Sequence, residues 1–308
     1  MLQQKLYWFL CFFSLLGFGQ EKMILSGVAS DTNTNETLIG VSVYIAELNI
    51  GTYTNEYGFY SISLPKGTYT VQISYIGFET ITEKIEINQN TKKNFGLIES
   101  KLELNEVVIT KNIYRNNIKK PEMSVNKLSI NTIKQMPAIL GETDVIKSIL
   151  TLPGVTNAGE GQSGFNVRGG SADQNLVLLD EATIYNTSHL FGFFSVFNTD
   201  AIKDLKLYKG GIPSRFGGRV ASVLEIYQKD GNSTDFHMSG GIGIISSRLL
   251  AEGPIVKDKG SFLFAGRSSY AHLFLKLTDN KNSAYFYDLN TKLSYKLNEN
   301  NNLYASGY

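Results

Sequence analysis

The sequence has 308 residues, of which 42% are hydrophobic and 19% are charged, so it is long enough for two or three folded domains. Its 29 basic and 28 acidic residues give a formal net charge of +1 and form no run of like charge. This composition argues against general disorder, and it gives no electrostatic footprint for a nucleic-acid partner.

The first 19 residues predict a secretory signal peptide. The basic residue Lys5 is followed by the apolar stretch 6–16 and by small residues at Gly17 and Gly19, after which we expect cleavage. A membrane-anchoring helix, the alternative, would need about 20 apolar residues. Cys11 is the only cysteine of the sequence, so the mature chain is expected to have no disulfide and no cysteine metal site.

Residues 23–98 predict a small antiparallel β-sandwich. Apolar and polar residues alternate in 68–75, which places one face of a strand in a core and the other in solvent. Three more short segments alternate in the same way, and turn residues separate them. Their apolar residues are Val41, Val43 and Ile45, then Tyr60, Ile62 and Leu64, then Ile81, Ile85 and Ile87, and the turns are 55–58, 65–67 and 76–78.

Several parts of this segment resemble the carboxypeptidase-regulatory-like domain. They are residues 40–44, 54–60, 65–69 and 74–79. The resemblance implies a seven-stranded prealbumin-like sandwich without catalytic residues. A secreted carboxypeptidase would require a cluster of zinc ligands, and the sequence contains none.

The composition becomes polar and charged from 99 to 120, which indicates an exposed linker. Within it, the short apolar run 104–110 has two interpretations. It is either the last strand of the sandwich, or an unpaired strand that adds to the sheet edge of a partner. The run resembles the TonB box, which implies binding to TonB and its inner-membrane energising complex. The residues concerned are Glu106, Val107, Val108, Ile109 and Thr110.

Residues 121–230 predict a mixed α/β domain. Apolar residues at helical spacing indicate a helix over 144–152 that ends at Pro153-Gly154. The apolar runs 176–179 and 220–227 indicate strands. A short helix is expected from Asp200, leading into a further strand at 205–208.

Five motifs in this domain occur in the order and spacing of the TonB-dependent receptor plug, which they resemble. They are residues 152–155, 165–170, 177–180, 202–203 with 208–211, and 216–220. The resemblance points to Arg168, Gly169, Gly170, Asp180, Gly210, Gly211, Gly217, Gly218 and Arg219 as plug motif residues.

The chemistry of these residues suits a compact domain held inside a barrel. Glycine pairs allow tight turns and close backbone approach. Arg168 and Arg219 can each form bidentate bonds to carboxylates of a surrounding wall, and in the family such arginines pair with acidic barrel residues. The alternative is that both are ordinary surface arginines.

Residues 236–308 predict the first strands of a transmembrane β-barrel. An apolar face alternates with a polar one over 287–297. Weaker strands are expected at 236–247, 260–270 and 302–308, with turns at 252–259 and 298–301. Four strands cannot close, and plugged transporters use about 22. We therefore expect the N-terminal part of a longer receptor of the Bacteroidetes type.

The sequence carries no recognisable catalytic constellation. His189, His237 and His272 stand without partners at the spacing of a metal site or a catalytic pair. The run 240–245 departs from a dinucleotide-binding loop because Ser246 follows it and no βαβ unit surrounds it. We expect no enzyme activity, no metal and no cofactor.

The sequence therefore predicts a multi-domain chain with an all-β sandwich, an α/β plug and an incomplete outer-membrane β-barrel. The leading hypothesis is energy-coupled import of a siderophore-like or other nutrient, with the sandwich in the periplasm and outer-membrane lipid around the barrel. The stretch 210–219 is closer to siderophore or vitamin receptors than to oligosaccharide importers of the SusC type. The alternative, if the protein ends at Tyr308, is a ligand-binding or signalling module that does not transport.

Overall fold

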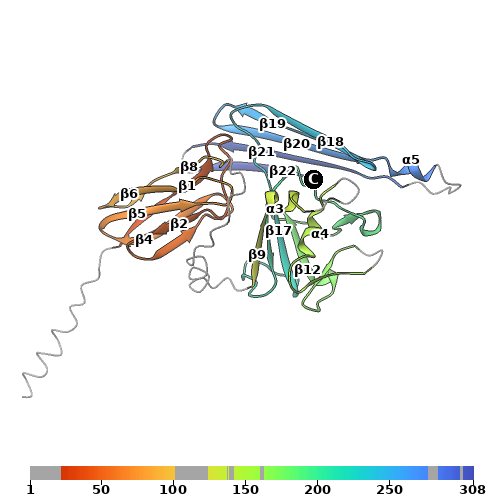
Figure 1. Cartoon of the computed structure of the whole chain (residues 1–308), viewed down its shortest axis with the longest axis horizontal. Coiled ribbons are helices and arrows are strands. Elements are labelled where there is room, and N and C mark those ends of the chain that lie inside the picture. The colour runs from red at the N-terminus through yellow and green to blue at the C-terminus, as the bar shows by residue number, and fades with distance from the viewer. Residues whose placement is uncertain are drawn as a thin grey trace, which may run out of the picture. The chain divides into compact units, whose positions relative to one another are not determined.

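The computed structural model describes residues 22–100, 124–136, 138, 142–159, 163–276, 284–298 and 301–308. The expected signal peptide and the TonB-box-like residues 106–110 lie outside this part of the chain. The chain divides into two compact units, 1–29 with 40–101 and 30–39 with 102–308. Many of their elements are labelled in Figure 1. Among the described residues, no helix has the length and apolarity needed to cross a membrane.

The first unit is a β-sandwich of two four-stranded sheets. One sheet has the order β4-β1-β7 with β8 also paired to β1, and the other has the order β3-β2-β5-β6. The expected seven strands are eight here, because residues 91–97 form two short strands. The strands are β1 (Lys22–Asp31), β2 (Ser42–Ile45), β3 (Ile50–Tyr53), β4 (Phe59–Pro65), β5 (Gly67–Ser74), β6 (Ile81–Ile87), β7 (Thr91–Lys92) and β8 (Phe95–Leu97).

The alternation in the sequence sets the faces of these strands. Val43 and Ile45 of β2 are buried, and so are the three alternating apolar residues of β4, which are Tyr60, Ile62 and Leu64. In β6 the residue Ile87 is buried while Ile81 and Ile85 are half-buried. Tyr60 stacks on Phe95 at 5.8 Å between ring centroids, and its hydroxyl donates to a backbone carbonyl inside the sandwich. The core of the sandwich is therefore the inner faces of the two sheets.

The second unit contains a mixed α/β part built on a five-stranded sheet of order β13-β12-β17-β16-β9. Strands β12 and β17 are parallel, and the other neighbours are antiparallel. The elements are β9 (Val125–Ser129), α3 (Ile130–Lys134), α4 (Val145–Ile149), β10 (Val155–Asn157), β11 (Phe165–Val167), η1 (Ala172–Gln174), β12 (Asn175–Leu179), β13 (Ala182–Thr183), β14 (Ser188–His189), η2 (Leu190–Gly192), β15 (Phe194–Ser195), β16 (Ile202–Tyr208) and β17 (Ser222–Gln228).

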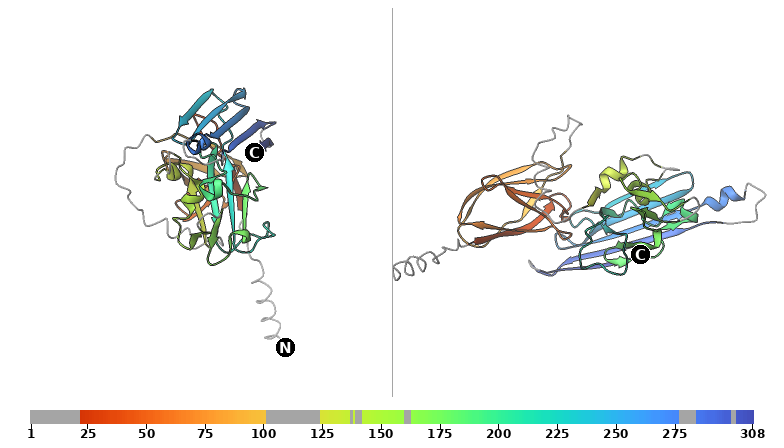
Figure 2. Two further views of the ribbon diagram at one scale, coloured as in Figure 1. Left: turned by 90° about the vertical axis from the view of Figure 1, so that its right-hand side faces the viewer. Right: turned by 90° about the horizontal axis from the view of Figure 1, so that it is seen from below.

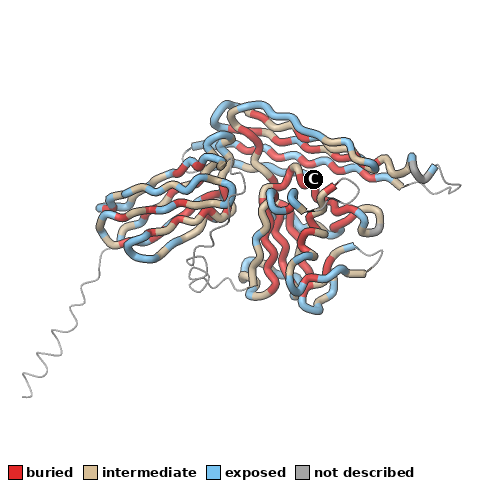
Figure 3. Tube along the Cα trace, viewed as in Figure 1, coloured by how far each residue is buried: buried red, intermediate tan, exposed pale blue. Residues whose placement is uncertain are grey.

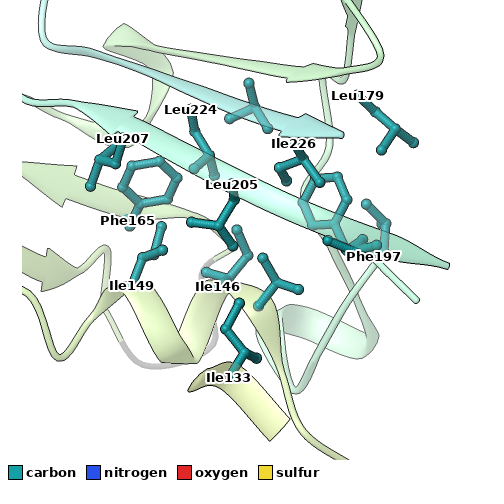
Figure 4. Close-up of a cluster of buried hydrophobic side chains, with 14 of the residues drawn as sticks. Ile133, Ile146, Ile149, Phe165, Leu179, Phe197, Leu205, Leu207, Leu224 and Ile226 are labelled. Carbon is teal, nitrogen blue, oxygen red and sulfur yellow. The ribbon is translucent and has the colours of Figure 1, made fainter. Parts of the chain in front are cut away.

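The core of this part lies between the sheet and the helices α3 and α4 (Figure 4). Ile133, Ile149, Leu205 and Leu224 are all fully buried there. Every residue of β17 is buried, and the central strands stand out as nearly continuous buried tubes in Figure 3. Strands that are buried on both faces have continuous apolar runs. The sequence therefore indicated these strands by apolar runs rather than by alternation of apolar and polar residues.

Helix α4 begins where the sequence predicts it. Asp144 is its N-cap, and the carboxylate accepts the amide of Lys147 at 3.0 Å. The expected helix from Asp200 does not form, because residues 198–201 close a turn through the Ala201 N–H and the Asn198 carbonyl, and β16 starts at Ile202. That expectation was wrong.

The rest of the second unit is a five-stranded antiparallel sheet of order β18-β19-β20-β21-β22, whose strands run side by side (Figure 2). The sequence predicted four strands, but 236–247 is a strand and a turn, and 246–256 is a strand of its own. Pro254 and the charges at 252–259 suggested a turn, yet Pro254 sits next to a register shift that accommodates it. The elements are β18 (His237–Ile242), β19 (Ser246–Val256), β20 (Gly260–Ser269), α5 (Ala271–Leu275), β21 (Tyr287–Lys296) and β22 (Asn302–Gly307).

Candidate functional site

The motif residues gather at one edge of the α/β sheet. The starts of β9, β12 and β17 and the end of β16 lie together there, because Tyr208 pairs with both Val125 and Val223, and Asn175 pairs with Ser222. The segments that carry the glycine and arginine motifs lead into or out of these strand ends. We call this edge, where the chain also enters β9, the entry edge.

Arg168 connects three motif segments at the entry edge. Its backbone is left-handed (φ 49°), and its amide donates to the Gly154 carbonyl at 2.9 Å. Its guanidinium donates from Nη2 to the Ser124 Oγ at 2.9 Å. A Cβ on Gly210 would lie 2.9 Å from the Arg168 Nη1, so a larger residue there would require the guanidinium to shift.

Lys209 lies beside Arg168. Its Nζ donates to the Pro153 carbonyl at 2.8 Å, and its amide donates to the Ser124 carbonyl at 3.0 Å. Desolvation and then the positive charge of Arg168 lower the pKa of Lys209. The motifs at 152–154, 168–170 and 209–211 therefore form one contact cluster, which the spacing in the sequence did not reveal.

The remaining motif residues have separate positions. A Cβ on Gly170 would lie 2.5 Å from the Ala221 Cβ, which explains the glycine at this position. Gly169 and Gly211 lie in turns and have positive φ angles. A Cβ on Gly217 or on Gly218 would have no neighbour within 4 Å. Arg219 is exposed and borders a cavity of about 280 Å³ that Phe165, Asn175 and Tyr185 also line.

In the sheet β18–β22, strand β21 is polar on the face that it buries, whereas β19 and β20 bury Leu250, Leu263 and Ala265 in an apolar cluster with Ala201. In β21 the buried residues are Asp288, Asn290, Lys292 and Ser294. The alternating residues on the other face are exposed, and they include Tyr287 at 67% and Leu289 at 52%. A strand that buries its polar side chains and exposes its apolar ones is the reverse of a strand that faces water.

Arg267 on β20 is the centre of one buried cluster between this sheet and the α/β part. Its Nε donates to Asp288 Oδ2 at 2.8 Å, its Nη1 to Glu142 Oε2 at 3.0 Å, and its Nη2 to the Ser195 carbonyl at 2.6 Å. The His189 Nε2 lies 2.5 Å from Asp288 Oδ1. The guanidinium satisfies both buried carboxylates, as a buried ion pair requires.

Lys292 on β21 is the centre of a second cluster. Its Nζ lies 3.0 Å from Asp230 Oδ1 and 3.4 Å from Asp180 Oδ2, and it donates to the Gln228 carbonyl at 2.9 Å. Burial alone would raise the pKa of Asp230, but Lys203 and Lys292 outweigh it and hold that pKa below its ordinary value. Asp180, a motif residue, also accepts the Gln228 amide at 2.9 Å.

The expected pairing of Arg168 and Arg219 with acidic residues of a surrounding wall stays a prediction. Among the described residues, the α/β part supplies the carboxylate of the pairs that Arg248 and Arg267 make with Asp200 and Glu142. In one contact the carboxylate belongs to the sheet, where Asp288 faces His189 of the α/β part. Within that same portion of the chain Arg168 contacts a hydroxyl and no carboxylate. Arg219 borders the cavity instead.

His189, which has no partner at the spacing of a metal site or a catalytic pair in the sequence, contacts Asp288 in the structure. Besides Asp288, it stacks on Phe286 with 4.4 Å between ring centroids. The sequence gives no signal for the contact with Asp288, because 99 residues separate the two partners. Among the described residues, no group of three or more histidine, cysteine, aspartate or glutamate side chains could hold a metal.

Two family models match the chain. The CarboxypepD_reg-like domain matches residues 25–109, and the TonB-dependent Receptor Plug Domain matches residues 119–223. The chain contains a TonB-dependent receptor plug domain. The α/β part, whose sheet has the order β13-β12-β17-β16-β9, carries the residues that match the plug model, and the sandwich carries those that match the CarboxypepD_reg-like model. Plug domains are parts of receptors, which are not enzymes, in agreement with the expectation from the sequence.

Solved structures of receptors are also similar to this chain. The siderophore receptor PirA from Acinetobacter baumannii is 16% identical, with a TM-score of 0.43, and the match covers 59% of this chain and 30% of that chain. The copper transporter OprC is 14% identical, with a TM-score of 0.39, and the match covers 57% of this chain and 28% of that chain. The chain thus spans about three tenths of the length of these receptors. No curated protein matches the sequence.

Proposed function

We propose that the protein is a TonB-dependent outer-membrane receptor that imports a small nutrient through a barrel closed by the plug. The observation that carries this proposal is the reversed burial of β21, whose polar residues bind the plug while Tyr287, Leu289 and Leu293 are exposed. An exposed apolar face of this kind fits outer-membrane lipid. The sandwich would then lie in the periplasm, exported by the signal peptide at 1–19.

TonB is the proposed partner, and residues 106–110 are its proposed binding segment. Strand addition requires a backbone amide, so Val107→Pro should abolish most binding of the TonB C-terminal domain to the whole receptor. Val107→Ile, which keeps the amide and the β-propensity, is the matched control and should bind as the native chain does. Equal TonB affinity of the proline variant and the native protein would refute the assignment of this segment.

The second candidate function is a ligand-binding or signalling module that does not transport. The two functions differ in whether the protein takes up ligand under energy from TonB. Uptake by cells that lack and contain TonB separates them, with a panel of iron chelates as probes because a siderophore-like ligand is the proposed class. Ligand binding without TonB-dependent uptake would favour the signalling module.

A further inference from the structure

Residues 30–39, which lead from β1 towards β2, belong to the second unit of the chain. The residues directly before and after them belong to the first unit, with the rest of the sandwich. A turn that only connects two strands of a sandwich would make its contacts within that sandwich. The contacts of residues 30–39 with residues 203–258 of the second unit therefore indicate a further role for this segment.

The tip of the segment is held in shape by its own residues. Ser30 pairs with Thr37 in an antiparallel bridge, and the Asp31 amide donates to the Glu36 carbonyl at 2.9 Å. Asn35 has a left-handed backbone (φ 59°), a conformation in which asparagine is enriched, and its amide donates to the Asp31 carbonyl at 2.9 Å. These local contacts order the tip, which lowers the entropic cost of every contact that it makes elsewhere.

The tip is hydrogen-bonded to the junction, our name for residues 229–235, which lead from β17 of the plug sheet to β18. The Ser233 amide donates to the Thr34 carbonyl at 3.2 Å. The Thr234 hydroxyl donates to the Asn33 carbonyl at 2.8 Å. Because both acceptors are backbone carbonyls of the ordered tip, the contact fixes the position of the tip on the junction.

Glu36 adds a charge pair to the same contact. Its Oε1 lies 3.5 Å from the Lys203 Nζ and accepts the Asp230 amide at 3.1 Å. The side chains of Lys203 and Glu36 are 10% and 19% exposed, so salt screens their attraction little. Burial alone would lower the pKa of Lys203, but Asp230 and Glu36 outweigh it and raise that pKa. Glu36 therefore helps Asp230 to keep Lys203 charged in a buried position.

Asp230 connects this pair to the sheet β18–β22. Its Oδ2 lies 3.2 Å from the Lys203 Nζ, and its Oδ1 lies 3.0 Å from the Nζ of Lys292 on β21. The two lysines thus share the Asp230 carboxylate, and Glu36 supplies Lys203 with a second one. Loss of the Glu36 charge would leave Lys203 to compete with Lys292 for Asp230.

We propose that residues 30–39 are a clasp on the junction and that Glu36 is the positioning residue through which the clasp orients Lys203 and Asp230. The clasp ties the chain of the sandwich to the second unit at a point other than the expected linker 99–120. A shift of the clasp then acts on the contact between Asp230 and Lys292, and so on the contact between plug and sheet. The inference concerns contacts of the folded chain, and it holds whether or not the protein transports a ligand.

A disulfide tests whether the clasp lies on the junction. Thr34→Cys with Ser233→Cys places the two cysteines on residues whose backbones share a hydrogen bond, which is within the reach of a disulfide. Cys11, the only native cysteine, lies in the expected signal peptide. Mild oxidation of the whole receptor should join these two cysteines within most molecules, as mass spectrometry of the peptides can show.

Thr34→Cys with Asp173→Cys is the matched control for the crosslink. Asp173 comes just before β12, whose first residue pairs with the first residue of β17, whereas Ser233 follows the opposite end of β17. The control pair should therefore stay reduced. Failure of the first pair to crosslink, or equal crosslinking of both pairs, would overturn the clasp.

Hydrogen exchange of the whole purified receptor tests the role of Glu36. Glu36→Gln keeps an acceptor for the Asp230 amide and removes the charge, so the amides of Asp230 and Ser233 should exchange about tenfold faster. In a Lys203→Met background the same change should not speed their exchange, because the cation that Glu36 serves is gone. Glu79→Gln, which changes an exposed glutamate of the sandwich, is the matched control and should alter neither amide.

Two exchange results would contradict the role given to Glu36. One is unchanged exchange of the Asp230 and Ser233 amides in Glu36→Gln. The other is an equal increase with and without Lys203, since a merely structural glutamate would loosen the junction in either background.

Discussion

The Arg267 cluster gives a quantitative prediction for the contact between plug and sheet. Arg267 has 4% of its side chain exposed, and its partners Glu142 and Asp288 have 7% and 0%. Arg267→Met removes the only arginine or lysine shown between these two carboxylates in the described residues and leaves both charges buried. Losing one partner of a buried pair typically costs about 3–5 kcal/mol, so the free energy of unfolding of the plug should fall by that amount.

A matched control comes from the same interface. The side chains of Arg248 and Asp200 are 31% and 14% exposed, so water already solvates part of this pair. Arg248→Met should therefore reduce the free energy of unfolding by no more than about 1 kcal/mol. Urea unfolding of the purified receptor, followed by pulse proteolysis of the plug, measures both values.

Neutralising Glu142 and Asp288 should restore the free energy of unfolding that Arg267→Met loses. The triple variant Arg267→Met, Glu142→Gln, Asp288→Asn leaves neither carboxylate charged in the cluster, and replacing a whole buried ionic group by neutral residues is often close to neutral. Equal destabilisation of the plug by Arg267→Met and Arg248→Met would contradict this prediction. A triple variant that is less stable than Arg267→Met alone would contradict it as well.

Two further predictions concern single residues of the plug. Burial raises the pKa of Asp204 to about 6. The protonated carboxyl group therefore contributes fully to the free energy of unfolding below about pH 4. That contribution, up to about 3 kcal/mol, is lost as the pH rises through about 6. The difference in free energy of unfolding between Asp204→Asn and the native protein should therefore shift in favour of the variant over this range in urea titrations, and a difference that does not change with pH would contradict the prediction. Gly170→Ala should lower the melting temperature, because its Cβ would lie 2.5 Å from the Ala221 Cβ and overpacking costs about 1–3 kcal/mol. Gly217→Ala, whose Cβ would have no neighbour within 4 Å, should melt like the native protein, and equal melting of the two variants would contradict the packing argument.

The sequence predicted those parts of the fold that depend on local patterns. The alternation at 68–75 and 287–297 indicated β5 and β21, and the N-cap Asp144 marked the start of α4. The turn at 55–58 was also predictable, since the Asn55 side chain accepts the Tyr57 and Phe59 amides, as asparagine commonly does in turns. In each case the determinants lie within a few residues of one another.

What the sequence could not predict depends on contacts between distant segments. Arg267 and Glu142 are 125 residues apart, and no local pattern says that they meet. The same holds for Arg168 and Ser124, which are 44 residues apart. Strand β19 was missed for another reason: Pro254 normally interrupts a strand, and only the neighbouring register shift in the paired strands allows it to stay.

The polar contact between plug and sheet has a consequence for how the two can part. A hydrogen bond to a protein group can be exchanged for one to water at a small net cost of about 0.5–1.5 kcal/mol, whereas separating apolar surfaces costs about 25 cal/mol for every Å² exposed. Lys292, Asn290 and Ser294 contact the plug through hydrogen bonds that water can replace. The core around Leu205 and Leu224 is apolar, and it belongs to the plug alone. Water can therefore replace the hydrogen bonds at β21 while the core of the plug stays dry, and the apolar cluster of Ala201 with Leu250, Leu263 and Ala265 is the part of the contact that resists separation.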